Sequence, residues 1–83
     1  MKIIWTEPEL TSQKGKRKKI LVSEAVVSGH EERFYLYQSG GKMIPTMWAL
    51  WDTETGTQHF LYSDGWEGAQ QVANERISEI LEE

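Results

Sequence analysis

The chain has 83 residues, a formal net charge of −4 and no cysteine. Its 39% apolar content, with four Trp, three Tyr and two Phe, excludes a wholly disordered chain, and the lack of cysteine excludes a disulfide framework or a Cys-ligated metal centre. No apolar run is long enough to cross a membrane, so we expect one small domain spanning residues 1–83, without a membrane segment. The lack of cysteine fits a cytoplasmic protein.

The N-terminal part of the chain combines a short apolar segment with a polar, basic one. Residues 2–5 predict a short strand, and residues 6–17, which hold Pro8 and Gly15 and show no periodicity, predict a mobile arm or loop. Five basic side chains gather at the end of this arm: Lys14, Lys16, Arg17, Lys18 and Lys19. Because these carry +5, the rest of the chain carries −9, which predicts a basic arm on an acidic body.

Residues 18–62 show the two-residue alternation of β-strands, interrupted by turn sequences. The strands are predicted over residues 18–28, 32–38, 43–51 and 57–62. Ser39-Gly40-Gly41-Lys42 and residues 52–56 contain glycines that suit tight hairpins, and Gly56 suits the left-handed conformation. Such short connections join antiparallel neighbours, so we predict a β-meander of three to five strands.

Alternation assigns the strand residues to two opposite faces. Within residues 18–28, one face holds Ile20, Val22 and Val26, and the other holds Leu21, Ala25 and Val27. Within residues 32–38, Phe34 and Leu36 lie on one face, and Tyr35 and Tyr37 on the other. Within residues 43–51, Met47, Ala49 and Trp51 share one face, and Trp48 and Leu50 share the other. Both faces of each strand contain apolar or aromatic residues. Alternation within single strands does not decide which of them lies against the core.

The period changes to that of a helix over residues 65–82. Its apolar positions are Trp66, Ala69, Val72, Ala73, Ile77, Ile80 and Leu81. Asp64 and Glu67 predict a capping box, and packing of Trp66 is expected to anchor a first turn that Gly65 and Gly68 weaken. We therefore predict an α+β fold in which one amphipathic C-terminal helix packs on one face of an antiparallel sheet.

A single helix leaves the second sheet face without an obvious cover. The candidates for that face are Tyr35 and Tyr37 together with one of the two tryptophans, Trp48 or Trp51. Exposed aromatic rings on a sheet form the anchors of a protein interface or stack the bases of a single-stranded nucleic acid. The alternative is that the N-terminal residues Ile3, Ile4 and Trp5 fold over this face and make a second small core.

The basic run suggests a second class of partner, because clustered Lys and Arg attract phosphates. Lys14, Lys16, Arg17, Lys18 and Lys19 are the candidate nucleic-acid contacts, and a solvated loop is the alternative reading of the same residues. The acidic C-terminal helix limits where a nucleic acid could lie. Its last carboxylates, Glu79, Glu82 and Glu83, suggest either a solvated tail or a contact with a basic surface, including the arm of a second copy.

Catalysis finds little support in the sequence. The two histidines, His30 and His59, do not form a metal-binding pair, and neither a nucleophile motif nor a phosphate-binding loop is present. We therefore expect no enzyme activity, cofactor, metal or small-molecule substrate. The leading hypothesis is a binding or regulatory module that contacts a partner protein, or a second copy of itself, through Tyr35, Tyr37 and Trp48 or Trp51. Nucleic-acid binding through the basic arm is the second hypothesis.

Overall fold

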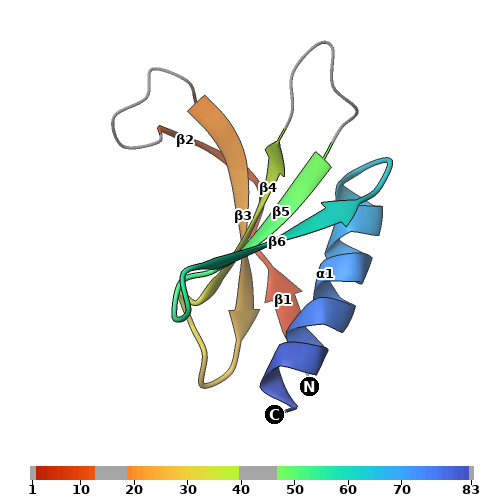
Figure 1. The fold of residues 1–83 in the computed structure, drawn as a ribbon. Helices are drawn as coiled ribbons and strands as arrows, with labels where there is room; N and C mark the ends of the chain where they lie inside the picture. The colour runs from red at the N-terminus through yellow and green to blue at the C-terminus, as the bar shows by residue number, and fades with distance from the viewer. Residues whose placement is uncertain (1, 13–18, 40–46, 83) are drawn as a thin grey trace.

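A computed structural model describes residues 2–12, 19–39 and 47–82 of the chain. These residues form an antiparallel sheet followed by a C-terminal helix (Figure 1). The elements are β1 (Ile3–Trp5), β2 (Glu9–Ser12), β3 (Lys19–Val27), β4 (Phe34–Ser39), β5 (Met47–Asp52), β6 (Thr57–Tyr62) and α1 (Trp66–Leu81). The structure thus confirms the α+β prediction of an antiparallel sheet with a C-terminal helix packed against it.

The sheet is a meander of β3, β4, β5 and β6, with β1 and β2 sharing the edge beyond β3. β1 lies along the C-terminal part of β3, with Ile3 opposite Val27, and β2 lies along its N-terminal part, with Glu9 opposite Val22. Thr6 bridges the gap between them. Its N–H donates to the carbonyl of Glu24 at 3.0 Å, and its Oγ1 accepts the N–H of Glu24 at 2.8 Å. The edge strand is therefore broken in two.

One part of the arm prediction is wrong. Residues 9–12, placed within the arm or loop of residues 6–17, form the strand β2. A strand that pairs through its backbone at a sheet edge needs no apolar periodicity, so the pattern gave no sign of it. Lys14, Lys16, Arg17 and Lys18 lie outside the described residues, as does most of the predicted turn at residues 39–42, whereas Lys19 begins β3.

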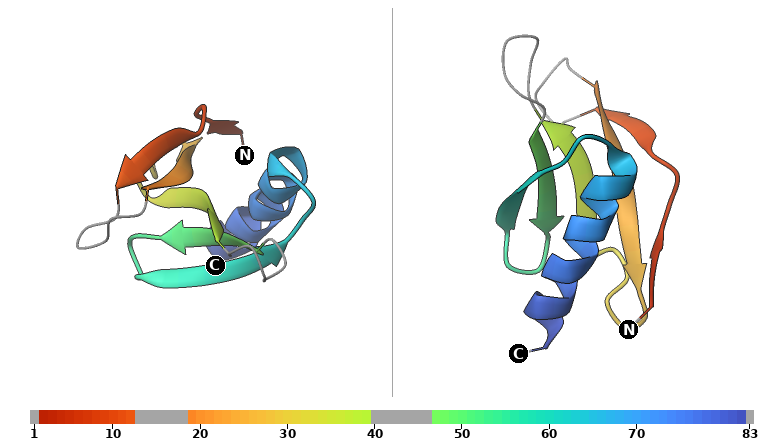
Figure 2. Two further views of the ribbon diagram at one scale, coloured as in Figure 1. Left: turned by 90° about the horizontal axis from the view of Figure 1, so that it is seen from above. Right: turned by 90° about the vertical axis from the view of Figure 1, so that its right-hand side faces the viewer.

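The sheet curves, and α1 lies against its concave side (Figure 2). The buried core on that side comprises Ala25, Val27, Phe34, Leu36, Trp48, Leu50, Leu61, Ala69, Ala73 and Ile77. Within each of β3, β4 and β5, these core residues lie on one of the two faces that alternation predicted for that strand. The helix contributes a stripe at four-residue spacing whose two alanines let its backbone approach the strands closely.

The N-terminal strand extends this concave core and leaves the convex face uncovered. Ile3 and Trp5 pack against the core cluster, and the indole Nε1 of Trp5 donates to Oδ1 of Asn74 on α1 at 2.8 Å. Ile4 points to the other side and is 56% exposed. The alternative of a second small core over the convex face, built from residues 3–5, is therefore wrong.

The helix starts one residue later than predicted, and its cap differs. Gly65 is the N-cap and makes no side-chain capping bond, so the predicted capping box of Asp64 and Glu67 does not form. The indole rings of Trp48 and Trp66 instead meet edge to face, 4.6 Å between centroids, which confirms that Trp66 packing anchors the first turn. A Cβ at Gly68 would collide with the Ser63 side chain, so this glycine permits the close return of the chain.

The β5–β6 connection has the predicted turn chemistry, because Gly56 adopts a φ of 72°. Within the described ranges, no helix combines the length and hydropathy needed to cross a membrane.

Candidate interaction surface

The convex face of the sheet carries a row of aromatic side chains across its last three strands. Strand register places Tyr37 beside Ala49 and Phe60, Tyr35 beside Trp51, and Met47 beside Tyr62. We call the set Tyr35, Tyr37, Trp51, Phe60 and Tyr62 the aromatic face. Since directly opposed residues of neighbouring strands point to the same side, these five rings share the face that α1 does not cover.

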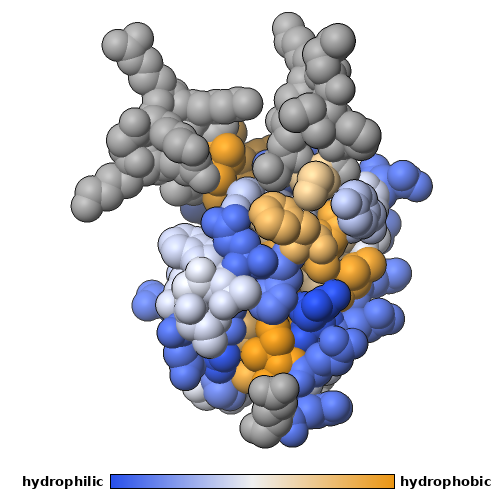
Figure 3. All heavy atoms as spheres, viewed as in Figure 1, coloured by the Kyte–Doolittle hydropathy of each residue, from blue (hydrophilic) through white to orange (hydrophobic). Residues whose placement is uncertain are grey.

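The aromatic face is open to solvent. Trp51 is 42% exposed, Phe60 54% and Tyr62 75%, whereas Tyr35 and Tyr37 on β4 are half-buried. In the space-filling view, a group of apolar side chains lies over β5 and β6, with hydrophilic side chains below it (Figure 3). Large aromatic side chains that remain exposed together on one surface are typical of interaction sites, and no element of the described part of the chain removes the apolar area of these rings from water.

The half-buried tyrosines are held in place by their neighbours. The rings of Tyr35 and Trp51 lie 6.2 Å apart at 44°. Partial burial raises the pKa of Tyr35, and the negative charges of Glu24 and Glu32 raise that pKa further; burial also raises the pKa of Tyr37. Both phenols therefore stay protonated at neutral pH and offer O–H donors at the β4 side of the aromatic face.

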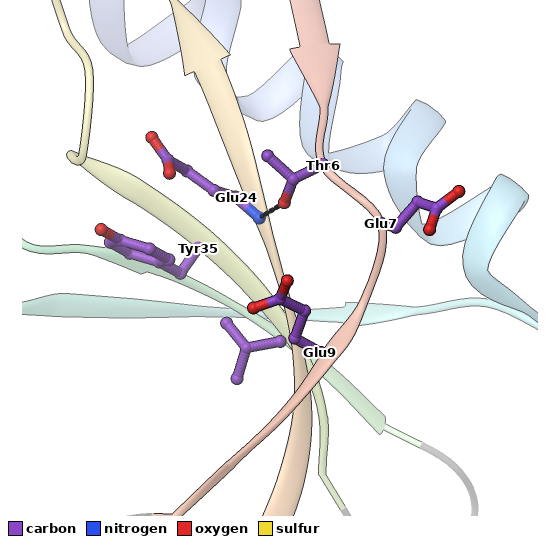
Figure 4. A pocket seen from close by; sticks show the side chains of 6 residues that line it. Thr6, Glu7, Glu9, Glu24 and Tyr35 are labelled. Atoms are coloured by element: carbon purple, nitrogen blue, oxygen red, sulfur yellow. Dashed lines mark hydrogen bonds between the residues drawn. The ribbon is translucent and has the colours of Figure 1, made fainter.

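Carboxylates border the aromatic face at its β2–β3 side. A shallow cavity of about 220 Å³ lies there, lined by Thr6, Glu7, Glu9, Val22, Glu24 and Tyr35. Glu9 and Glu24 turn toward the side of Tyr35, whereas Glu7 points away (Figure 4). A partner that covers the aromatic face thus meets negative charge beside Tyr35, which favours basic groups there over phosphates.

Trp48 does not belong to this surface. It is 2% exposed, lies under the helix against Trp66, and donates its indole Nε1–H to the carbonyl of Ser63 at 3.1 Å. Of the two candidate tryptophans, the structure therefore places Trp51 on the open face and removes Trp48 from the candidate site. The helix decides this, because it packs on the side of β5 that carries Trp48.

The candidate set from the sequence omitted two residues of this surface, Phe60 and Tyr62. Both lie in β6, which was predicted with correct bounds. Asp52 pairs with Thr57 across the turn, and this register aligns Ala49 with Phe60 and Met47 with Tyr62. They could have been found from the sequence by pairing the two strands across the turn of residues 52–56 and assigning paired residues to the same face.

A second cavity, of about 340 Å³, lies on the concave side between β6 and the C-terminal half of α1. Its lining comprises Asp52, Thr55, Thr57, His59, Arg76, Glu79 and Ile80. His59 lies beside carboxylates here, as an acid–base pair would require. However, the carboxylate of Asp52 already accepts hydrogen bonds from Arg33. Its Oδ1 accepts from Nε of Arg33 at 2.8 Å and its Oδ2 from Nη2 at 3.0 Å, in a bidentate pair. Asp52 therefore has a structural role.

The acid stability of the protein should depend on Asp52. The hydrogen bonds from Arg33 lower the pKa of this carboxyl below its unfolded value of about 3.9. Its stabilising effect is therefore complete above that unfolded value and is lost as the pH falls through the lower, folded pKa. We expect Asp52→Asn to be less stable than wild type at pH 7 in urea unfolding, and the difference to shrink toward pH 2. A difference independent of pH would contradict this linkage.

Other candidate groups do not assemble into a site. His30 lies in the turn between β3 and β4, far along the chain from the cavity that holds His59, and no cluster of three or more His, Asp or Glu suited to a metal is found among the described residues. Comparison with family models, curated proteins and solved structures finds no match to this chain.

Proposed function

We propose that this protein is a non-catalytic binding or regulatory module that docks a partner protein on the aromatic face. The observation that carries the proposal is a set of aromatic rings on a sheet face that no described element covers, with Trp51, Phe60 and Tyr62 exposed. Aromatic side chains supply large contact area at a low cost in conformational entropy, which is why they dominate binding hot spots. The cysteine-free sequence fits a cytoplasmic setting for this interaction.

The charges beside the aromatic face support a partner with basic groups. Glu24 is half-buried next to Tyr35, so a Lys or Arg at the rim of the partner can form an ion pair with the Glu24 carboxylate. Rim charges of this kind mainly orient the partner and speed its association. The binding energy itself would come from burial of the rings.

Single-stranded nucleic acid is the alternative ligand, because bases stack on exposed aromatic rings. The carboxylate of Glu24 would repel its phosphates at one end of the face. Binding would therefore depend on the basic run, Lys14, Lys16, Arg17, Lys18 and Lys19. This alternative predicts affinity that falls steeply with salt and is lost when the five basic residues become alanine. A fluorescence anisotropy titration with an oligonucleotide at low salt tests it.

Substitution of Trp51 is expected to weaken partner binding by ~30-fold or more, the effect of removing a central hot-spot residue. The change Trp51→Ala removes a ring that is 42% exposed and contacts Tyr35, without entering the core. The matched control is Val72→Ala, which truncates a 36% exposed apolar side chain on α1. Loss of binding with the helix control, and not with Trp51→Ala, would place the interface elsewhere.

A photo-crosslinking amino acid at position 51 finds the partner directly. In the native cells, irradiation should give a protease-sensitive adduct of defined mass from position 51, and none from position 71 on the exposed side of α1. A nuclease-sensitive adduct would support nucleic-acid binding instead. The absence of any adduct at position 51, or equal adducts at both positions, would contradict the proposal.

A further inference from the structure

The two edges of the sheet differ in their protection against pairing with another strand. The β1/β2 edge is broken between residues 6 and 8, holds Pro8, which lacks an N–H, and carries the exposed Glu7 and Glu9. Interruptions, prolines and charges are the devices by which sheets block edge-to-edge association. β6 has none of these devices. Its six residues contain no Pro, Gly, Lys, Asp or Glu, and they pair with β5 without a bulge.

The backbone of β6 directs unused hydrogen-bonding groups outward. Thr53 donates its N–H to the carbonyl of Arg33 at 2.8 Å, so the backbone N–H and C=O of Thr53 point toward β4. Successive residues of a strand direct these groups to alternate sides, because hydrogen-bonded and non-bonded pairs alternate in antiparallel strands. The N–H and C=O groups of Asp52 therefore point toward β6, where Asp52 is paired with Thr57. It follows that the residues of β6 whose backbone groups point toward β5 are 57, 59 and 61. The N–H and C=O groups of Gln58, Phe60 and Tyr62 therefore point away from the sheet, and among the described residues no hydrogen bond engages them.

The edge is also sterically accessible. β6 forms an outer border of the sheet in both views of Figure 2, while α1 crosses the concave side. The cavity between β6 and α1, about 340 Å³, shows that the helix does not pack tightly onto the first half of this strand. On the convex side, Phe60 and Tyr62 are the most exposed members of the aromatic face. Among the described residues no strand pairs with the outer edge of β6, so this edge is available to a further strand.

We propose that β6 pairs antiparallel with β6 of a second copy of this chain, so that two sheets join into one across a two-fold axis. Pairing of the outward-facing residues sets Phe60 opposite Phe60 of the second copy and Gln58 opposite Tyr62 of the second copy. Such an interface is self-complementary, as two-fold symmetry requires. Monomeric proteins block such pairing with charges, prolines or bulges on the edge strand, and the residues of β6 supply none of these.

Charge does not oppose this pairing. The chain carries −4 overall, but β6 contains no acidic or basic residue besides His59, which lies on the concave side opposite Leu50. The two-fold axis stands perpendicular to the sheet, so both aromatic faces point the same way. The dimer therefore presents one continuous aromatic surface, with Phe60 paired across its centre.

The test is sedimentation velocity over a concentration series with two single substitutions. Wild type is expected to pass from monomer to dimer, and Phe60→Lys, which adds a charge to the edge, is expected to weaken the dimer at least ~10-fold. Trp51→Lys is the matched control, since it adds the same charge to the same face one strand inward, and it should leave the dimer intact. A monomeric wild type at ~1 mM, or a Phe60→Lys dimer as tight as wild type, would overturn the proposal.

A second variant separates backbone pairing from side-chain contact. Gln58→Pro keeps every aromatic ring and removes one outward N–H, and proline is tolerated at an edge position of this kind. It should also abolish the dimer, and a persisting dimer would contradict edge pairing. If this variant does not fold, amide hydrogen exchange of the wild-type protein decides: the amides of Phe60 and Tyr62 should exchange more slowly at high protein concentration, and unchanged exchange rates would overturn the pairing. These experiments measure self-association only, so their outcome does not depend on whether Trp51→Ala loses partner binding.

Discussion

Replacement of Trp48 by alanine is expected to lower the free energy of unfolding by ~3–5 kcal/mol, the range for a large aromatic residue in a core. Trp48 is 2% exposed, and its ring packs edge to face on Trp66 at the start of α1. The substitution leaves a cavity beneath the helix and leaves the carbonyl of Ser63 without the indole donor. Since small domains are stable by only ~5–15 kcal/mol, urea unfolding followed by circular dichroism should show a large shift of the midpoint.

The second tryptophan of β5 is the control for this prediction. Trp51 lies on the opposite face and is 42% exposed, so Trp51→Ala should cost roughly 1 kcal/mol, mainly through the lost contact with Tyr35. Trp48→Phe keeps most of the buried ring and loses the hydrogen bond to Ser63, so its cost should fall between the two alanine variants. An equal cost for the two alanine substitutions would contradict the assignment of the two faces.

Removal of Arg33 is expected to destabilise the fold by about 3–5 kcal/mol, because it leaves a buried carboxylate without its cation. Asp52 is 1% exposed and is held by two hydrogen bonds from Arg33, at 2.8 and 3.0 Å. The guanidinium also lies 4.8 Å from the centroid of the Phe34 ring. Arg33→Ala therefore removes both an ion pair and packing, and chemical unfolding at pH 7 measures the combined loss.

Two further substitutions show whether the buried pair causes this loss. Glu54 also pairs with Arg33, at 2.9 Å, but its side chain is 66% exposed, so Glu54→Gln should cost at most about 1 kcal/mol. Arg33→Lys keeps the charge and loses the two-pronged geometry, so it should be clearly less stable than wild type. If Glu54→Gln proved as harmful as Arg33→Ala, the buried pair with Asp52 would not be the source of the stability.

Much of the architecture follows from local pattern. The two-residue alternation of a strand places Phe34 and Leu36 on one face of the sheet and Tyr35 and Tyr37 on the other. The same rule places Trp48 and Trp51 on different faces. The short turn with a left-handed Gly56 fixes how β5 and β6 pair, and the helical spacing from Trp66 to Leu81 defines α1. These features depend on near neighbours in the chain, so the sequence predicts them well.

Other features depend on contacts between distant segments. β2 exists because β3 offers a backbone edge to it, and its residues show no strand pattern of their own. The helix begins at Trp66, with Gly65 as its N-cap, where the Trp66 ring packs on Trp48 of β5, although Asp64 and Glu67 match a capping box. In both cases packing between distant segments outweighed the local signal.

The sequence by itself determined that the sheet has two apolar faces and a single helix to cover them. Only the tertiary structure decided which face the helix takes, because both faces are apolar enough to be buried. With Trp48, Leu50 and Phe34 under α1, the opposite side keeps Tyr35, Tyr37 and Trp51, and register across the turn adds Phe60 and Tyr62. The candidate surface therefore consists of the aromatic side chains on the sheet face that α1 does not cover.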